Sequence, residues 1–255
     1  MTRIPTEIAK IERPSRALCD RLAEIGSATA SSELNRVFGI RSVHIEGPQA
    51  LVRGRKAVAG PALTLQFMPK REDLFKGGEY DNPELQLHRH VMYPAEAGDM
   101  IVVDACGDMS SGIFGEMMLT FFAGRGGLGV VVDGCIRDSG PARDIDVGIW
   151  VKGTTPNYHA QTSIVPWAVN VPVQCGGVLV MPGDIIVADD DGAIVVPAGL
   201  GEQLADVAGE HAEWEEFSRL RLSQGADLAK YYPLTDEVQD EYLAWKSAQE
   251  DGSGS

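Results

Sequence analysis

Paired cysteines and long apolar runs are both missing from this sequence. The four cysteines are widely spaced and include no Cys-x-x-Cys pair, which argues against a zinc ribbon or a disulfide-stapled domain and favours a reduced compartment. Charged residues interrupt the first twelve positions, at Arg3, Glu7, Lys10 and Glu12. We therefore expect neither a signal peptide nor a membrane span, and we expect a cytoplasmic protein.

Positive charge is also scarce. The chain has 22 Lys and Arg against 37 Asp and Glu, a formal net charge of −15. Binding to phosphate backbones needs clustered Lys and Arg, so nucleic acid is not an expected partner. An acidic protein that handles an anionic substrate must concentrate positive charge locally, through a few arginines or a bound cation.

Nucleotide-binding motifs are absent as well. The loop at 104–112 contains glycines after a predicted strand, but it has neither Gly-x-Gly spacing nor the lysine of a P-loop. A methyltransferase that uses S-adenosylmethionine is a weak alternative for this loop. A loop that lets backbone amides approach a carboxylate explains the same glycines.

The patterns that are present predict an α/β chain. Two short helices are expected over 15–38, interrupted at Gly26 and closed at Gly39. Apolar runs bounded by Gly and Pro predict strands, and a helical pattern falls between two of them, at 114–123. The strand, helix and strand over 100–132 form a βαβ-like unit, whose connections can carry a site. The predicted strands are 57–68, 100–103, 130–132, 185–187 and 194–196.

After Pro197 the composition changes to Ala, Glu, Leu and Arg, and a helix is expected to about Leu222, with a stop at Gly225. A second helix is expected over 238–248. We divide the chain into a domain at 1–200, a helical extension at 201–250 that packs on the body or on a neighbouring subunit, and a flexible tail at 251–255 of linker composition.

The densest polar constellation is Gly115-Glu116, at a predicted helix start, followed after twenty residues by Arg137-Asp138. A helix N-terminus offers N–H donors to a carboxylate, and an arginine fork binds the same anion. Asp138 and Glu116 are hard oxygen ligands of the kind that Mg²⁺ and Mn²⁺ prefer. Together these groups fit a 2-oxo acid. An adjacent Arg-Asp pair is also common as an exposed turn with a weak ion pair.

The block Gly-Val-Val-Val-Asp-Gly-Cys-Ile-Arg-Asp at 129–138, with Gly-Glu at 115–116, resembles the class II 4-hydroxy-4-methyl-2-oxoglutarate / 4-carboxy-4-hydroxy-2-oxoadipate aldolases. These share a fold with the regulator of ribonuclease E activity A. The resemblance covers roughly 15–197 and is supported by the segment 180–197. It implies mixed β-layers with flanking helices in a swivelling β/β/α domain, and assembly as a homotrimer or homohexamer.

The resemblance also implies roles for individual residues. Asp138 should ligate a divalent cation, Mg²⁺ or Mn²⁺, and Arg137 should contact the pyruvate-like end of the substrate. Backbone amides of the loop should hold the substrate carboxylate. Glu116 stands where many members have Asp, and its extra methylene could shift a water-mediated metal contact. The loop residues are Gly115, Glu116, Met117 and Met118.

Three further expectations are less local. His159 is a candidate contact for the distal end of the substrate, although a lone loop histidine is more often structural. In some members a Glu from a neighbouring subunit's C-terminal helix completes the metal shell, and Glu215 is the candidate here, with Glu216 close behind. His88 and His90 point to different faces of a helix, so we expect both on the surface.

The implied activity is that of a carbon–carbon lyase. It would cleave a 4-hydroxy-2-oxo acid by a retro-aldol reaction that releases pyruvate, decarboxylate oxaloacetate through the same enolate, or do both. The alternative is a non-catalytic regulator that binds a protein partner. The segment between Pro69 and Pro94 is an insertion relative to smaller family members. We expect it to border the mouth of the site and to alter which distal substituent is accepted.

Overall fold

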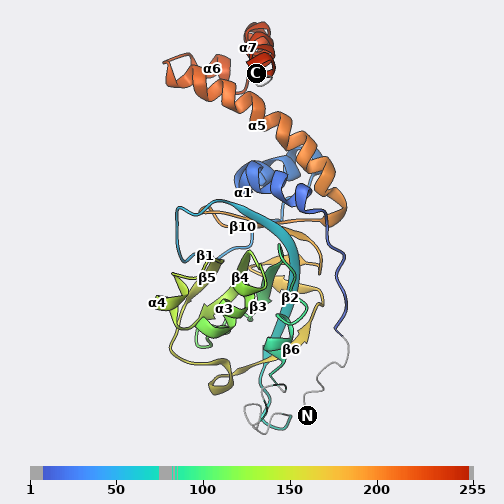
Figure 1. The fold of residues 1–255 in the computed structure, drawn as a ribbon, viewed down its shortest axis with the longest axis vertical. Coiled ribbons are helices and arrows are strands. Elements are labelled where there is room, and N and C mark those ends of the chain that lie inside the picture. Colours follow the sequence, from blue (N-terminus) through green and yellow to red (C-terminus); the bar gives the residue numbers. More distant parts are fainter. Residues whose placement is uncertain (1–7, 75–81, 83, 85, 253–255) are drawn as a thin grey trace.

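The computed structural model describes residues 8–74, 82, 84 and 86–252. Within that part of the chain, one eight-stranded mixed sheet and one two-stranded hairpin are flanked by helices (Figure 1). The helices are α1 (Arg16–Phe38), α2 (Leu87–His90), α3 (Glu116–Gly124), α4 (Ser139–Ala142), α5 (Gly201–Ser223), α6 (Leu228–Tyr231) and α7 (Gln239–Gly252). The strands are β1 (Gln49–Ala50), β2 (Val58–Pro69), β3 (Met100–Asp104), β4 (Gly129–Ile136), β5 (Gly148–Thr154), β6 (Ile164–Val169), β7 (Val173–Cys175), β8 (Val178–Val180), β9 (Ile185–Ala188) and β10 (Ala193–Val196).

The large sheet has the strand order β1-β5-β4-β3-β2-β9-β10, with β6 paired to β2. Strands β2, β3, β4 and β5 run parallel to one another, whereas β1, β6, β9 and β10 pair antiparallel with their neighbours. Every residue of β3 and β4 is buried. Their continuous Ile, Val and Met runs suit parallel strands that are covered on both faces.

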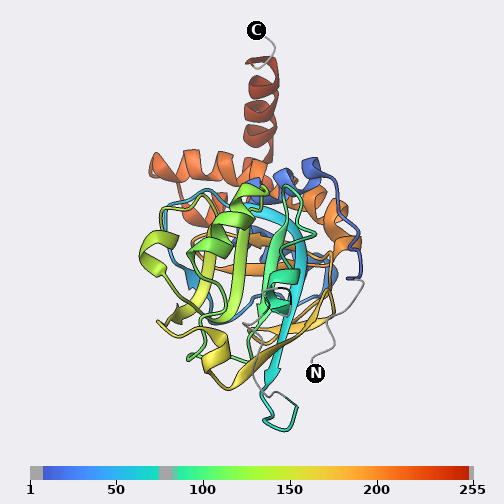
Figure 2. The ribbon, with the colours of Figure 1, turned by 60° about the horizontal axis from the view of Figure 1, so that its bottom comes forward.

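Different elements cover the two faces of the sheet. Helix α3 lies against one face (Figure 2), where Leu119 and Phe122 share a core with Ile101 and Val130. The β7–β8 hairpin, together with β9 and β10, covers the other face in a second core that contains Trp150. A third core joins α1 and the first half of α5 to β9 and β10. The fold is therefore α/β, as the sequence patterns predicted, with the mixed β-layers and flanking helices that the resemblance implied.

Most of the predicted elements are confirmed. The βαβ-like unit is β3-α3-β4, with β3 and β4 parallel. The helix expected to break at Gly26 does so, since Gly26 has φ 81° and ψ 167°. Ser27 follows this break, and its backbone amide and its hydroxyl each donate a hydrogen bond of 2.7 Å to the Asp189 carboxylate. Gly39, with φ 70°, ends α1 as a left-handed cap, as helix C-termini commonly do.

The C-terminal helices divide between the body and a projection. Leu204 and Ala208, in the first half of α5, are buried against α1. The second half of α5 leaves the body and carries α6 and α7 (Figure 1), and we call residues 211–252 the arm. The ring of Phe217 is the centre of the arm's small core, with Tyr231, Tyr242 and Trp245 within 5.9 Å of it.

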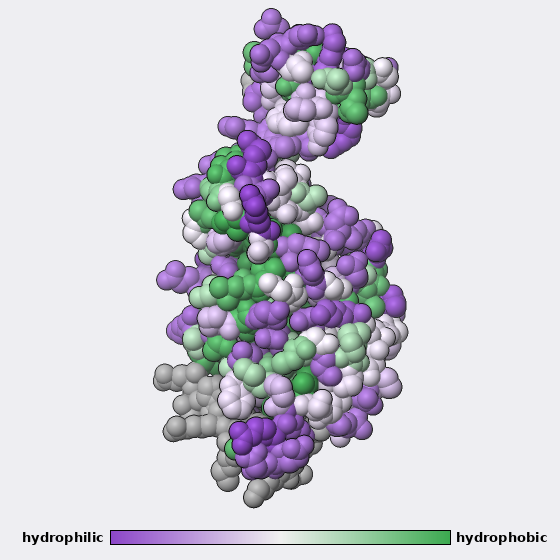
Figure 3. Space-filling view, turned by 180° about the vertical axis from the view of Figure 1, so that it is seen from behind, coloured by the Kyte–Doolittle hydropathy of each residue, from purple (hydrophilic) through white to green (hydrophobic). Residues whose placement is uncertain are grey.

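The arm also exposes apolar side chains, among them Leu220, Leu228 and Leu243. Seen from behind, further apolar residues gather on the body below the arm (Figure 3). The division at residue 200 and the packing of the extension on a neighbouring subunit stay predictions. Of the expected tail, 253–255 lie outside the described residues. No helix in the described part is long and apolar enough to cross a membrane.

Candidate active site at the carboxyl edge of the parallel strands

The two halves of the polar constellation meet at the carboxyl edge of the parallel strands. Gly115 is the residue before α3, and Arg137 and Asp138 directly follow β4. The segment that leads into α3 lies alongside the end of β4. The Ile113 amide donates to Cys135 O at 2.9 Å, and the Arg137 amide donates to Phe114 O at 3.0 Å. The βαβ-like unit therefore brings together two residue pairs that are separated by twenty residues in the sequence.

The absence of a Cβ at Gly115 allows a close approach. A Cβ at this position would lie 2.5 Å from Asp138 Oδ2 and 2.8 Å from Arg137 Nε, well inside van der Waals contact. The neighbouring Glu116 amide donates to Asp138 Oδ2 over 3.3 Å. The start of α3 and the Asp138 carboxylate are thus in direct contact, and a larger residue at 115 would displace the Asp138 and Arg137 side chains.

Asp138 adopts the left-handed backbone region, with φ 56° and ψ 38°. For a residue other than glycine this conformation costs free energy and persists only where the surroundings enforce it. The conformation places the carboxylate 3.3 Å from Arg137 Nε, with both side chains about two-fifths exposed. An ion pair this exposed contributes little stability, so the strain favours a binding role over a structural one.

A cavity of about 250 Å³ lies beside this pair. Four regions line it: the start of α3 with the residues before it, the two residues after β4, the segment around α2, and the loop that contains His159. All the candidate residues except Glu215 and Glu216 line it. The lining residues are Gln86, His88, Arg89, Gly112, Ile113, Gly115, Glu116, Met117, Met118, Arg137, Asp138, Tyr158 and His159.

The loop amides differ in their availability. The Met118 amide donates to Gly115 O at 3.1 Å and so is engaged in the first turn of α3. Among the residues that the structure describes, the Glu116 amide has only its long contact to Asp138. The expected set of carboxylate-binding amides therefore reduces to Gly115, Glu116 and Met117, and this role stays a prediction.

Two buried histidines form one wall of the cavity. The rings of His88 and His159 meet edge to face with centroids 4.1 Å apart, and the side chains are 4% and 1% exposed. Burial, followed by the charges of Lys70 and Arg137, lowers the pKa of His159 to about 4. Burial also lowers the pKa of His88, with His159 the next cause. Near neutral pH both rings are uncharged and can offer hydrogen bonds only.

The surface position predicted for His88 is wrong. Helix α2 packs against β6, and this contact turns Leu87 and His88 inward. His90 agrees better with the prediction, because it is only partly buried. The apolar neighbours Val91 and Met92, both buried, were the available signal that this segment belongs to the core. Lys76, Gly77 and Gly78 of the same insertion lie outside the described residues.

The depressed pKa of His159 makes a prediction about stability. The unfolded chain protonates this residue below about 6.5, whereas the folded chain resists protonation until about pH 4. The contribution of neutral His159 to folding stability is therefore fully present above pH 6.5 and is lost as the pH falls towards 4. Between pH 7 and pH 5 the loss should be about 2 kcal/mol smaller in His159→Gln than in the wild type. Urea unfolding at the two pH values measures this difference, and equal losses would contradict the burial-induced shift.

The cavity offers a divalent cation few protein ligands. Across the described residues, no three or more His, Cys, Asp or Glu side chains lie close enough together to hold a metal ion. Asp138 and Glu116 are the carboxylates that line the cavity. Mg²⁺ commonly keeps several waters and takes only one or two carboxylates. The half-exposed Asp138 fits such a water-rich site and does not fit a closed structural one.

Glu215 does not line this cavity. It lies on α5 in the arm, where Tyr232 Oη donates to it at 3.2 Å and His211 Nε2 lies 3.2 Å away. Its expected contribution to the metal shell concerns a neighbouring subunit, and that contribution stays a prediction.

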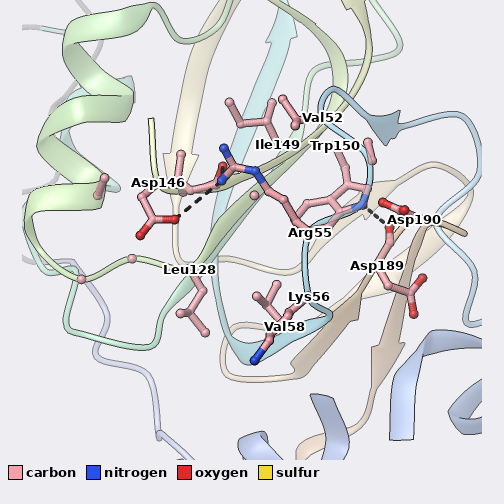
Figure 4. Close-up of a pocket in the computed structure, with 16 residues that line it drawn as sticks. Val52, Arg55, Lys56, Val58, Leu128, Asp146, Ile149, Trp150, Asp189 and Asp190 are labelled. Carbon is pink, nitrogen blue, oxygen red and sulfur yellow. Dashed lines mark hydrogen bonds and ion pairs between the residues drawn. The ribbon is translucent and has the colours of Figure 1, made fainter. Parts of the chain in front are cut away.

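A larger cavity, of about 490 Å³, lies at the opposite end of the parallel strands (Figure 4). Its main polar side chains already form hydrogen bonds to backbone carbonyls within the fold. Arg55 donates to the carbonyls of Val147 and Ile145 at 3.0 and 2.8 Å, and Trp150 Nε1 donates to Asp189 O at 2.7 Å. These bonds tie loops together. The smaller cavity, with its strained Asp138 and buried histidines, is the better candidate active site.

Comparisons with known proteins identify the family of this chain. The RraA-like family, described as Aldolase/RraA, matches residues 17–195. A Halalkalibacterium halodurans protein named "Putative 4-hydroxy-4-methyl-2-oxoglutarate aldolase" is 37% identical over 141 residues, which cover 55% of this chain and 66% of that protein, just under two thirds. The family match contains Glu116, Arg137, Asp138 and His159, and it ends before Glu215.

Two solved structures have a similar fold. Streptomyces coelicolor RraAS2, described as an unusual member of the RNase ES inhibitor RraA protein family, is 45% identical with a TM-score of 0.74, covering 82% of this chain and 100% of that one. An uncharacterized protein from Pseudomonas syringae pv. tomato is 22% identical with a TM-score of 0.75, covering 89% and 98%. The second likeness shows the fold alone.

Proposed function

Because this chain belongs to the RraA-like family, which includes aldolases and ribonuclease E inhibitors, we propose that it is a divalent-metal-dependent lyase. Its substrate would be a 4-hydroxy-2-oxo acid, cleaved by a retro-aldol reaction that releases pyruvate, or oxaloacetate, which it would decarboxylate. The observation that carries the proposal is the contact of Gly115, Arg137 and Asp138 beside a cavity of about 250 Å³. That volume suits a small oxo acid.

Each residue of the constellation has a role in this reaction. The Arg137 guanidinium would hold the carboxylate at the 2-oxo end and stabilise negative charge that develops on the neighbouring oxygen. Free amides at the start of α3 would bind the same carboxylate. Asp138 would hold the cation, with Glu116 beside it. When bound, Mg²⁺ or Mn²⁺ would supply Lewis-acid polarisation of the 2-oxo group.

Retro-aldol cleavage also needs a base for the proton of the 4-hydroxyl group. Glu116 lines the cavity and is half-buried, so its carboxylate can accept this proton through a water molecule. The neutral His159, which lines the cavity, would donate or accept a hydrogen bond at the distal part of the substrate. Decarboxylation of oxaloacetate needs no such base, so both reactions fit one site.

The experiment that tests the proposal is a coupled assay for pyruvate release. Purified protein is given 4-hydroxy-4-methyl-2-oxoglutarate, 4-carboxy-4-hydroxy-2-oxoadipate or oxaloacetate, with Mg²⁺, with Mn²⁺ or with a chelator. We expect turnover of at least one substrate with metal and its loss with chelator. Turnover that the chelator leaves unchanged would contradict metal dependence, and no turnover at all would contradict the lyase.

The alternative is a non-catalytic regulator that binds a protein partner. The observation in its favour is the 45% identity to RraAS2, whose whole length is covered. A regulator needs no strained Asp138 beside a cavity, so we rank it second. Absence of pyruvate release, combined with inhibition of an RNase E-type enzyme by the purified chain, would make the regulator the better account.

A further inference from the structure

Helix α2 brings a second arginine to the cavity. Arg89 is partly buried and lines the cavity together with Arg137. Arg137 lies against Asp138 at 3.3 Å. In contrast, the Arg89 guanidinium makes no hydrogen bond and no ion pair with any residue that the structure describes. Within the described residues its positive charge is therefore unpaired, whereas that of Arg137 is partly balanced.

The charges of both arginines lower the pKa of the same buried histidine, His88. Burial is the main cause of the lowered pKa of His88, and the charges of Arg89 and Arg137 contribute to it. The two guanidinium groups therefore both lie within electrostatic reach of one histidine on the cavity wall. In a chain with a formal net charge of −15, two arginines in one small cavity are a local concentration of positive charge, which an anionic ligand requires.

The number of arginines indicates the chemistry of the ligand. One guanidinium fork matches one carboxylate, with two parallel N–H···O bonds. Neither carboxylate that lines the cavity forms an ion pair with Arg89 among the described residues. Asp138 is paired with Arg137, and in that part of the chain no ion pair joins Glu116 to Arg89. If Arg137 binds the carboxylate at the 2-oxo end, the second fork remains for a second carboxylate of the same small molecule.

We propose that Arg89 is a specificity-determining residue, which binds a carboxylate at the end of the substrate away from the 2-oxo group and selects dianionic over monoanionic 2-oxo acids. This inference rests on the proposed function for the assignment of Arg137 to the 2-oxo end. It also gives the insertion a role, because α2 lies within the segment between Pro69 and Pro94. The insertion thus supplies the residue that binds the distal carboxylate.

The test compares the binding of two unreactive ligands by calorimetry in the presence of Mg²⁺. 2-Oxoglutarate carries a distal carboxylate, and 2-oxopentanoate has the same chain length without it. Neither has the 4-hydroxyl group that cleavage requires. We expect the wild type to prefer 2-oxoglutarate by about 10- to 100-fold, the effect of charge-assisted hydrogen bonds to one carboxylate. Arg89→Gln should reduce this preference to less than about 3-fold, and Arg89→Lys should retain part of it.

Arg71→Gln is the matched control. Arg71 comes from the same insertion, pairs with Asp73 at 2.6 Å and does not line the cavity. Its loss removes the same charge and should leave the preference unchanged. A preference that survives in Arg89→Gln, an equal fall in Arg71→Gln, or no preference in the wild type would overturn the assignment.

Binding and turnover separate the two proposals. A preference for 2-oxoglutarate that depends on Arg89, in a protein that releases no pyruvate, would uphold the second-carboxylate site and overturn the lyase. Metal-dependent pyruvate release without any Arg89-dependent preference would do the reverse. Far-ultraviolet circular dichroism of the variants checks that each has folded, which the absence of described partners for Arg89 leads us to expect.

Discussion

Replacing Gly115 with alanine should lower kcat/KM for pyruvate release by about 100-fold or more, while the protein stays folded. The new Cβ would lie 2.5 Å from Asp138 Oδ2 and 2.8 Å from Arg137 Nε, so both side chains must move by roughly an ångström. Misplacement of that size at a reacting centre costs about 100-fold in rate. Gly115 has φ −116° and ψ 179°, an extended conformation that alanine adopts without strain.

Gly124→Ala is the control for this substitution. Gly124 is the last residue of the same helix, and no atom lies within 4 Å of the Cβ that alanine would add. Steady-state kinetics of the two variants, together with their melting temperatures, separate damage to the site from damage to the fold. Full activity in Gly115→Ala, or equal losses in both variants, would show that the contact between Gly115 and Asp138 has no part in the reaction.

Asp138→Asn should lower metal-dependent kcat/KM by about 1,000-fold, because a Lewis-acid cation contributes several kcal/mol of transition-state stabilisation. Asparagine has the same shape and tolerates the left-handed backbone that Asp138 adopts. The substitution therefore removes the charge with little effect on the conformation. Glu116 remains in the cavity, so weak residual turnover at high metal concentration is expected.

Asp144→Asn is the matched control for charge. Asp144 follows Arg143, and this Arg-Asp pair lies six residues after Arg137-Asp138. Asp144 is exposed and does not line the cavity. Its substitution should change the rate by less than about 2-fold, as expected for a surface charge. A loss in Asp144→Asn as large as that in Asp138→Asn would indicate a general effect of net charge. Unchanged turnover in Asp138→Asn would remove this residue from the metal site.

The sequence predicted the reaction centre better than it predicted the rest of the cavity. The βαβ-like unit is encoded locally, by two buried apolar runs with a helical pattern between them, and such a unit must bring its connections to one edge of the sheet. Hence Gly115-Glu116 and Arg137-Asp138 could be placed together from their spacing alone. The left-handed backbone of Asp138 could not be predicted from the sequence, because a position directly after a strand does not by itself specify this conformation.

The contribution of α2 was missed for a physical reason. Its single turn is too short for a hydrophobic period, and it becomes buried through a long-range contact with β6. His88 and Arg89 are neighbours in the sequence, yet the first is buried and the second is only partly so. Only the packing of α2 decides which of these side chains is covered. The wall that we propose for the distal substituent therefore had to be seen in the structure.

The most direct test of the central claim is a titration with Mn²⁺ followed by electron paramagnetic resonance. The claim is that the Asp138 carboxylate, beside the start of α3, holds the cation that the reaction needs. We predict one Mn²⁺ bound per chain in the wild type and in Asp144→Asn, with at least 10-fold weaker binding in Asp138→Asn. Equal Mn²⁺ affinity in Asp138→Asn and the wild type would contradict the account.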